Sequence, residues 1–301
     1  MQVDGLTKSF GDLLLFRKIS FGVAEGQRIG LIAKNGTGKT TLLNIIAGKE
    51  GYDEGSIVFR RDLRVGYLEQ DPHYPEDLTV LEACFYHGNS TVELIKEYES
   101  CMETEGNPGL EELLARMEHE KAWDYERKAK QILSQLKIRD FSQQIKHLSG
   151  GQLKRVALAN VLITEPDFLI LDEPTAGLDP KERISIRNYI AELSKDKIIL
   201  FATHVVSDIE CIADKVLLLK SGEIIATGTP VELIESMAGK VGEITCTLDE
   251  VGELQKEYKI GNIRQRKNGL ALRVVGDELP EEAVKVGDNI DLEDVYLYYF
   301  E

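Results

Sequence analysis

Short apolar runs alternate with longer segments of helical spacing along the chain, and this pattern predicts a mixed α/β fold. Runs typical of buried strands occur at residues 28–32, 168–171, 197–202 and 215–219, and a further strand is expected at 223–226. Segments with helical periodicity follow two such runs, at 40–47 and 181–193. Strands that alternate with helices form a largely parallel sheet covered by helices. We therefore expect a ligand at the carboxyl ends of these strands, where open sheets of this kind bind their ligands.

A glycine-rich turn, AKNGTGKTT, occupies residues 33–41 directly after the first apolar run. In a P-loop of this kind, backbone N–H groups wrap phosphates, Lys39 reaches the β- and γ-phosphate oxygens, and the Thr40 hydroxyl binds Mg²⁺. Ala33 stands where the pattern has glycine, which excludes only a backbone of positive φ. The alternative is a chance Gly-Lys-Thr. The expected nucleotide contacts are Asn35, Gly36, Thr37, Gly38, Lys39, Thr40 and Thr41.

Two adjacent acids, Asp172 and Glu173, follow the apolar run 168–171. At the carboxyl end of a strand they can divide two tasks: Asp172 can hold Mg²⁺, usually through water, and Glu173 can deprotonate an attacking water. The alternative is that the pair only caps the next helix. The P-loop earlier in the chain favours the first interpretation.

The sequence LSGGQ at 148–152 opens a helical segment expected at 153–163, and a Ser-Gly-Gly turn before a helix is a second anion site. Gln70 follows an expected strand at 64–68, and His204 follows the strand expected at 197–202. In chain order the motifs are Phe10, the P-loop, Gln70, LSGGQ, Asp172-Glu173, Asp179 and His204. This set resembles the ATP-binding cassette (ABC) family over roughly residues 1–235.

The resemblance implies a P-loop NTPase fold of the ABC type, with a RecA-like core, an antiparallel β subdomain and a helical subdomain, followed here by a small C-terminal α/β domain. It implies ATP and Mg²⁺ as cofactors, and a head-to-tail dimer with this chain or a related cassette that sandwiches two ATP. The implied catalytic residues are Glu173, His204 and Gln70. The implied metal ligands are Thr40, Gln70 and Asp172. Further ATP contacts implied are Phe10, which stacks on adenine, and Ser149, Gly150, Gly151, Gln152 and Asp179, which face the partner's site.

The two parts of the chain resemble two different branches of the family. Residues 1–175, including LITEPDFLILDEPT, look like the first cassette of an ABC-F protein, but that class continues with Asn-His-Leu-Asp where this chain has Ala-Gly-Leu-Asp-Pro. Residues 176–301 resemble the ATP-binding subunit of an ABC-2 type transporter. One hypothesis is a hybrid, natural or engineered, joined near Thr175. The alternative is a single lineage that mixes both styles.

Three segments describe the expected domain organisation. A nucleotide-binding domain spans 1–238, its helical subdomain lies at about 77–163, and a small α/β accessory domain spans 239–301 with a hairpin turn at Asn268-Gly269. No catalytic constellation is expected in the accessory domain. The residues expected in the core of the helical subdomain are Trp123, Leu133, Leu136 and Ile138.

Composition limits the partners. The 301 residues carry a formal net charge of −16, which argues against broad binding to nucleic acid or anionic lipid. Four scattered cysteines without a C-x-x-C pair suggest neither a disulfide framework nor a zinc site. No secretory signal is found, and no apolar run approaches the length of roughly 20 residues that a membrane helix needs. We expect a cytoplasmic chain without membrane insertion of its own, held at most on the inner face of the cell membrane by another chain.

The leading functional prediction is an ATP-hydrolysing cassette subunit that dimerises around two ATP and powers a separate membrane permease. One alternative is an ABC-F-like ribosome-acting ATPase, although that class carries two cassettes per chain. Residues 88–146 also hold 12 acids and 9 bases, whereas an arm that contacts RNA should be basic. Another alternative is an engineered chimeric cassette with ATPase activity and no native partner. A cassette that clamps DNA or proteins is disfavoured because no sustained heptad repeat is present.

Overall fold

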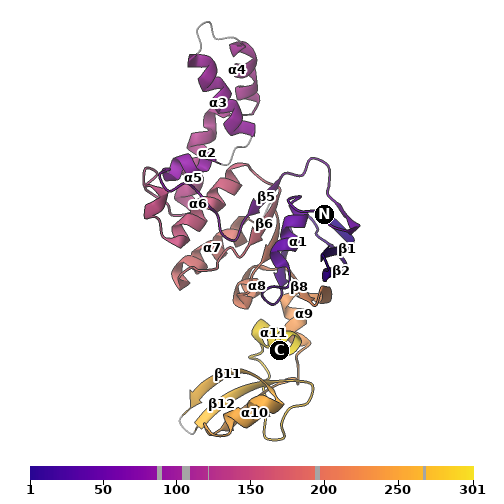
Figure 1. Ribbon diagram of the computed structural model, residues 1–301. Helices are drawn as coiled ribbons and strands as arrows, with labels where there is room; N and C mark the ends of the chain where they lie inside the picture. The colour runs from indigo at the N-terminus through magenta and orange to yellow at the C-terminus, as the bar shows by residue number, and fades with distance from the viewer. Residues whose placement is uncertain (87–89, 104–108, 121, 194–196, 267–268) are drawn as a thin grey trace. The chain divides into compact units, whose positions relative to one another are not determined.

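The computed structural model describes residues 1–86, 90–103, 109–120, 122–193, 197–266 and 269–301 (Figure 1). These residues form two compact units. The first unit comprises Met1–Arg60 and Ile198–Glu301, and the second comprises Arg61–Lys197. The chain enters and leaves the second unit once.

Three groups of strands and five helices make up the described part of the first unit. They are β1 Gln2–Phe10, β2 Leu13–Gly22, β3 Arg28–Ile32, α1 Lys39–Ile46, β4 Glu54–Val58, β7 Ile198–Ala202, α8 Val206–Ile212, β8 Lys215–Lys220, β9 Glu223–Gly228, α9 Pro230–Glu235, β10 Val241–Cys246, α10 Val251–Glu257, β11 Lys259–Arg266, β12 Gly269–Val275, β13 Val284–Lys285 and α11 Leu292–Phe300. The strands predicted near residues 28–32, 197–202, 215–219 and 223–226 are confirmed.

The central strands of the first unit lie in the order β7-β3-β8-β9. β3 pairs parallel with both β7 and β8, and β9 pairs antiparallel with β8. The side chains of β3, β7 and β8 are almost all buried, as expected of strands covered on both faces, whereas β9 alternates between exposed and half-buried positions. A separate antiparallel sheet, β2-β1-β4, is the antiparallel β subdomain that the resemblance implied.

The accessory segment forms its own antiparallel sheet in the order β11-β12-β10-β13 (Figure 1). β11 and β12 pair from Arg266 and Gly269 onward, as the predicted hairpin requires, while Asn268 of the predicted turn lies outside the described residues. Helix α11 packs on α8 and α9. Since this sheet belongs to the same unit as β3, the division expected at residue 238 stays a prediction.

A buried ion pair fixes α11 to the accessory sheet. Arg273 Nε and Nη2 of β12 each lie 2.6 Å from a carboxylate oxygen of Asp294 in α11. The same carboxylate accepts the Asp291 backbone N–H, and the Asp291 side chain caps the helix in return. Such a doubly hydrogen-bonded pair tolerates burial because its polar atoms are satisfied.

The second unit combines two strands with a group of helices. They are β5 Val65–Leu68, α2 Val80–Tyr86, α3 Ser90–Glu103, α4 Leu110–His119, a 3₁₀ turn Ala122–Asp124, α5 Tyr125–Gln135, a 3₁₀ turn Ile145–His147, α6 Gly150–Ile163, β6 Phe168–Asp172 and α7 Pro180–Leu193. β5 and β6 pair in parallel. Helices α3 and α4 run beside each other (Figure 1).

The expected core of the helical subdomain is correct in three of its four residues. Leu133, Leu136 and Ile138 are buried, but the prediction for Trp123 is wrong, because 49% of this residue is exposed. In the short 3₁₀ turn before α5, the neighbouring Ala122 faces the small core formed with α3 and α4. The Trp123 ring instead packs edge-on against the Tyr98 ring, with centroids 5.1 Å apart.

All four cysteines are free thiols. Cys84, Cys101 and Cys246 are buried, and burial raises the pKa of the Cys84 thiol to about 12. Cys211 is exposed on α8. Of the helices in the described ranges, none has both the length and the apolar character needed to cross a membrane.

Candidate nucleotide site

The predicted P-loop connects β3 to α1 in the first unit. Gly36 and Gly38 have φ values of +78° and +94°, which glycine adopts without the penalty that a side chain brings. Ala33 is buried and is not among the described non-glycine residues with positive φ. The alanine at this position therefore fits the loop, as the sequence predicted.

Lys39 lies at the centre of this loop. Its Nζ donates to the carbonyl oxygens of Ala33 and Lys34 at 3.0 and 3.3 Å, and to Asn35 Oδ1 at 3.3 Å. The side chain is buried, whereas Asn35 and Thr40 are exposed. A cation at the start of α1, beside the glycine-rich loop and the exposed Thr40, is the arrangement that a bound phosphate chain requires.

His204 leaves the same sheet edge as the P-loop. β3 and β7 pair in register from Arg28 with Ile199 to Leu31 with Ala202, so the loops that follow these strands start side by side. Lys34, Asn35 and His204 line one cavity of about 770 Å³. The register thus brings together two of the predicted ATP contacts that are about 170 residues apart in sequence.

Phe10 ends β1 in the antiparallel subdomain of the same unit. It is 49% exposed, and Lys8 Nζ lies 4.6 Å from its ring centroid. An exposed ring at a strand end can serve as a flat surface for a base. Its role in stacking on adenine stays a prediction.

The accessory domain also lines the cavity beside the P-loop, which the sequence analysis missed. Arg273, Tyr296 and Leu297 lie on its wall, and the Glu301 carboxylate pairs with Lys34 Nζ at 3.1 Å. The aromatic ending DLEDVYLYYFE was the available signal, because an amphipathic helix needs a surface to cover. Nothing in its local pattern indicated that α8, next to His204, provides that surface.

In the second unit, the predicted acids and Gln70 leave one edge of the β5–β6 pair. The register ends with Leu68 opposite Leu171, so Gln70 and Glu173 each lie two residues beyond paired positions. Asp172 and Glu173 are buried, and Gln70 is exposed. Glu173 has a φ of +48°, a left-handed conformation that is uncommon outside glycine.

Residues 149–152 form the N-terminus of α6 and cap it. The Ser149 N–H donates to Gln152 Oε1 at 2.8 Å, and the Gln152 N–H donates to Ser149 Oγ at 3.2 Å, which makes a capping box. The helix consequently begins at Gly150, three residues before the predicted start at 153. Gly150 is exposed, and Gly151 is covered by the Glu182 side chain, so that a Cβ at Gly151 would lie 1.9 Å from Glu182 Oε2.

Asp179 is exposed before α7, and its Oδ1 accepts the Glu182 N–H at 2.8 Å. Arg155 of α6 pairs with the Glu182 carboxylate at 2.9 Å. The LSGGQ turn and the loop that contains Asp179 are therefore held together within this unit. The predicted role of Asp179 toward a partner stays a prediction.

The predicted metal ligands have the chemistry that Mg²⁺ prefers. Thr40 offers a hydroxyl, Asp172 a carboxylate and Gln70 an amide oxygen, all of them hard oxygen donors. Among the described residues, no group of three or more His, Cys, Asp or Glu side chains could form a complete metal site.

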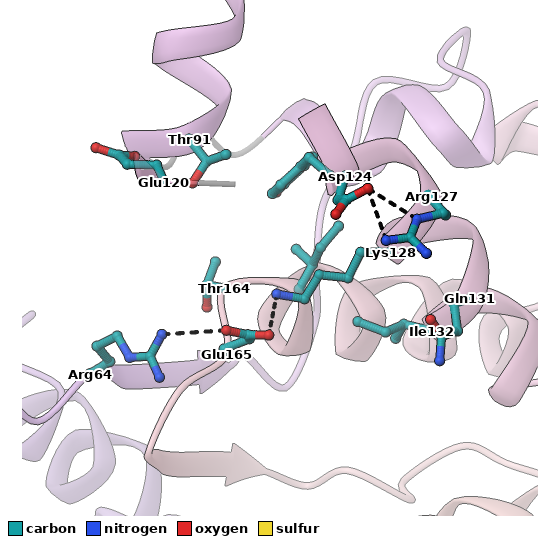
Figure 2. A pocket seen from close by; sticks show the side chains of 12 residues that line it. Arg64, Thr91, Glu120, Asp124, Arg127, Lys128, Gln131, Ile132, Thr164 and Glu165 are labelled. Carbon is teal, nitrogen blue, oxygen red and sulfur yellow. Dashed lines mark hydrogen bonds and ion pairs between the residues drawn. The ribbon is translucent and has the colours of Figure 1, made fainter. Parts of the chain in front are cut away.

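A different pocket lies at the opposite ends of the two strands of the second unit. Figure 2 shows Glu165, which precedes β6, between Arg64 and Lys128, with Lys128 Nζ 2.5 Å from the carboxylate. Asp124 and Arg127 form a further ion pair on its rim. The cavity measures about 490 Å³, but each cation on its wall already has a carboxylate partner. We assign no function to it.

Comparisons with known proteins agree with this geometry. Residues 16–176, more than half of the chain, match the family model described as ABC transporter. The chain belongs to this family of ATP-binding cassettes. It is 40% identical to the uncharacterized ABC transporter ATP-binding protein YfmR of Bacillus subtilis, over 64% of this chain and 32% of that protein. It is 33% identical to the Nod factor export ATP-binding protein I of Bradyrhizobium diazoefficiens, over 84% of this chain and 79% of that protein.

Solved structures of cassettes share the fold. The ADP conformation of an ATP-binding cassette of an ABC transporter has a TM-score of 0.60 and 26% identity, and the match covers 78% of this chain and 93% of that one. A dimeric bacterial ABC transporter cassette has a TM-score of 0.58 at 22% identity, with 76% and 97% covered, which shows the fold alone. The P-loop NTPase fold of the ABC type is thereby confirmed.

The chain spans only part of several curated relatives, about a third of YfmR and 59% of a sulfate/thiosulfate import protein CysA from Vibrio cholerae. The match to the Nod factor export protein covers enough of the chain to run across Thr175. The comparisons provide no evidence for a hybrid, and the single lineage stays the alternative hypothesis.

Proposed function

We propose that this chain binds ATP with Mg²⁺, hydrolyses it in a head-to-tail dimer that sandwiches two ATP, and thereby powers a separate membrane permease. The observation that carries the proposal is the P-loop itself, with left-handed Gly36 and Gly38 and the Lys39 ammonium held at the start of α1. An anion is stabilised there by N–H groups, by the helix dipole and by a fixed cation. The name of the Nod factor export relative supports the transport role.

The residues of the first unit bind the nucleotide. Lys39 and the N–H groups of the loop hold the β- and γ-phosphates, and Asn35 and Thr37 complete the loop. Phe10 stacks on adenine. His204, on the loop next to the P-loop, donates a hydrogen bond to the γ-phosphate and holds the attacking water. Thr40, Asp172 and Gln70 would hold Mg²⁺, which would supply positive charge to neutralise the phosphates.

The acids of the second unit supply the base. Glu173 accepts a proton from the water whose oxygen attacks the γ-phosphorus, and the bond from that phosphorus to the bridging oxygen of ADP breaks. Gln70 orients the water. The products are ADP and inorganic phosphate.

The LSGGQ turn acts on the partner's nucleotide. Ser149 already accepts a hydrogen bond within α6, so its own hydroxyl proton remains for a phosphate oxygen. Gly150, Gly151 and Gln152 present the N-terminus of α6 to the same anion. Asp179 contacts the partner's site. We place the dimer in the cytoplasm, on the inner face of the membrane that holds the permease, with no role for nucleic acid.

Two variants test the proposal. Lys39→Ala should abolish binding of labelled ATP, because it removes the cation that meets the β/γ charge while leaving the loop. Glu173→Gln should bind ATP and lose about 10²- to 10⁴-fold in turnover, because the amide keeps the shape and loses the base. The second variant should accumulate as an ATP-bound dimer in light scattering. Wild-type turnover by Glu173→Gln would contradict the proposal.

A further inference from the structure

The helix that begins with the LSGGQ turn carries a buried lysine that the proposed chemistry does not yet use. Lys154, in the first turns of α6, is only 7% exposed. Its Nζ donates to the backbone oxygen of Glu173 at 2.5 Å and to that of Ala176 at 3.2 Å. One ammonium therefore holds both ends of the turn that follows β6.

That turn contains a backbone conformation in need of support. Glu173 has φ +48°, which costs free energy for a residue with a Cβ. Such conformations persist where surrounding contacts determine them, and they concentrate at functional sites. The Ala176 N–H also donates to the Glu173 oxygen, at 3.2 Å, so the strained residue is fixed by two donors to one carbonyl.

The contacts of Lys154 offset the free-energy cost of burying its ammonium group. Burial lowers the pKa of its amine, against the opposing charges of Asp71, Glu173 and Asp172. A buried ammonium loses its hydration, and this costs free energy that an exposed lysine would not lose. Most other residues of α6 are apolar. The cost is offset only if the ammonium has acceptors, and the two carbonyl oxygens provide them.

We propose that Lys154 is a positioning residue for Glu173: it ties the LSGGQ helix to the turn 173–176 and so fixes the direction in which the Glu173 carboxylate points. The next residue, Arg155, ties the same helix to α7 through Glu182. The helix that meets the partner's ATP and the base that activates water then move as one body. This inference rests on the proposed function of Glu173.

Lys154→Met tests it, because methionine keeps the length of the side chain and removes the donor. We expect kcat to fall about 10- to 100-fold, the range for a misplaced catalytic group. The KM and the equilibrium Kd for ATP should change less than about twofold, since the P-loop lies in the other unit. Lys154→Arg, which can still donate to both carbonyls, should restore most of kcat. Lys146→Met, at an exposed lysine before the LSGGQ turn, is the matched control and should match wild type.

A double-mutant cycle separates this inference from the proposed function. If Lys154 acts through Glu173, Lys154→Met should have no further effect on kcat in the Glu173→Gln background. If Glu173→Gln alone leaves turnover intact, the proposed function fails. If Glu173→Gln is slow but Lys154→Met turns over normally, or its loss multiplies fully with that of Glu173→Gln, only the positioning role is overturned.

Hydrogen exchange gives a readout other than activity. Amides of residues 175–178 should exchange faster in Lys154→Met than in wild type, while those of α1 should not change. Unchanged exchange in the turn would refute the tether. Should Lys154→Met fail to fold, Lys154→Gln replaces it: one remaining donor should give a kcat between those of wild type and Glu173→Gln, and a kcat equal to that of wild type would overturn the proposal.

Discussion

Replacing either left-handed glycine of the P-loop with alanine should destabilise the chain, but to different extents. Gly36→Ala and Gly38→Ala both place a Cβ on a backbone of positive φ, at +78° and +94°. That conformation costs a non-glycine residue about 1–2 kcal/mol. The gain of about 0.4–1 kcal/mol from a stiffer unfolded chain applies to both variants and cancels between them.

The surroundings of the two glycines produce the difference. Among the described residues, nothing lies within 4 Å of a Cβ at Gly36. A Cβ at Gly38 would lie 2.8 Å from Leu15 Cγ and 2.9 Å from the ring of Phe16, which is fully buried. The buried Phe16 ring cannot move aside cheaply, and overpacking of a close-packed site costs about 1–3 kcal/mol. We therefore expect Gly38→Ala to lose about 1–3 kcal/mol more than Gly36→Ala.

Urea unfolding without nucleotide, followed by far-ultraviolet circular dichroism, measures this difference in the free energy of unfolding. If the two units unfold in separate transitions, the transition of the unit that carries the P-loop is the one to compare. If the loop of Gly38→Ala rearranges locally instead, its stability falls less and its ATP affinity falls more than that of Gly36→Ala. Equal stability and equal ATP affinity of the two variants would refute the reasoning.

Two further predictions concern the dimer and pH. Ser149→Arg should leave the ATP affinity of the monomer nearly intact and block dimer closure. Mixing it with Lys39→Ala should restore part of the ATPase activity, in the one composite site that keeps both an intact P-loop and an intact LSGGQ turn. Full hydrolysis by Ser149→Arg alone, at dilutions where wild type is monomeric, would contradict this. Arg28 donates to Asp214 at 3.0 and 2.5 Å, and this hydrogen bond holds the pKa of Asp214 below its ordinary value. A depressed carboxyl pKa adds stability above the unfolded pKa near ~4 and loses it as pH falls through the folded pKa. The stability gap between wild type and Arg28→Met should therefore narrow below pH ~4, and should stay under about 1 kcal/mol because the Asp214 side chain is 38% exposed. Urea unfolding across this pH range checks it, and a gap that widens in acid would show the wrong sign.

Periodicity and turn chemistry were sufficient to predict most of the elements. The strands β3, β6, β7 and β8 and the helices α1 and α7 follow from short apolar runs and from Pro180 in a first helical turn. The start of α6 was predicted three residues late, because the sequence Ser-Gly-Gly favours a turn while the reciprocal hydrogen bonds of Ser149 and Gln152 extend the helix over it. Motif order was sufficient for the family, which the comparisons confirm.

Contacts between distant segments were not predictable from local pattern. Trp123 was expected in a core because tryptophan is usually buried, yet its smaller neighbour Ala122 takes the inward position of a short 3₁₀ turn. No sequence pattern singled out Lys154, because its two carbonyl partners depend on how α6 packs against the turn after β6. The roles of the site residues remain predictions.

The distribution of thiols makes the chain suitable for site-selective labelling. Cys211 is the exposed cysteine, and the other three are buried. A maleimide dye should therefore react with the native chain at one position, with no engineered cysteine and no deletion of the others. Since α8 carries Cys211 and packs against α11, the emission of that dye would follow whether the accessory helix stays docked while ATP binds beside His204.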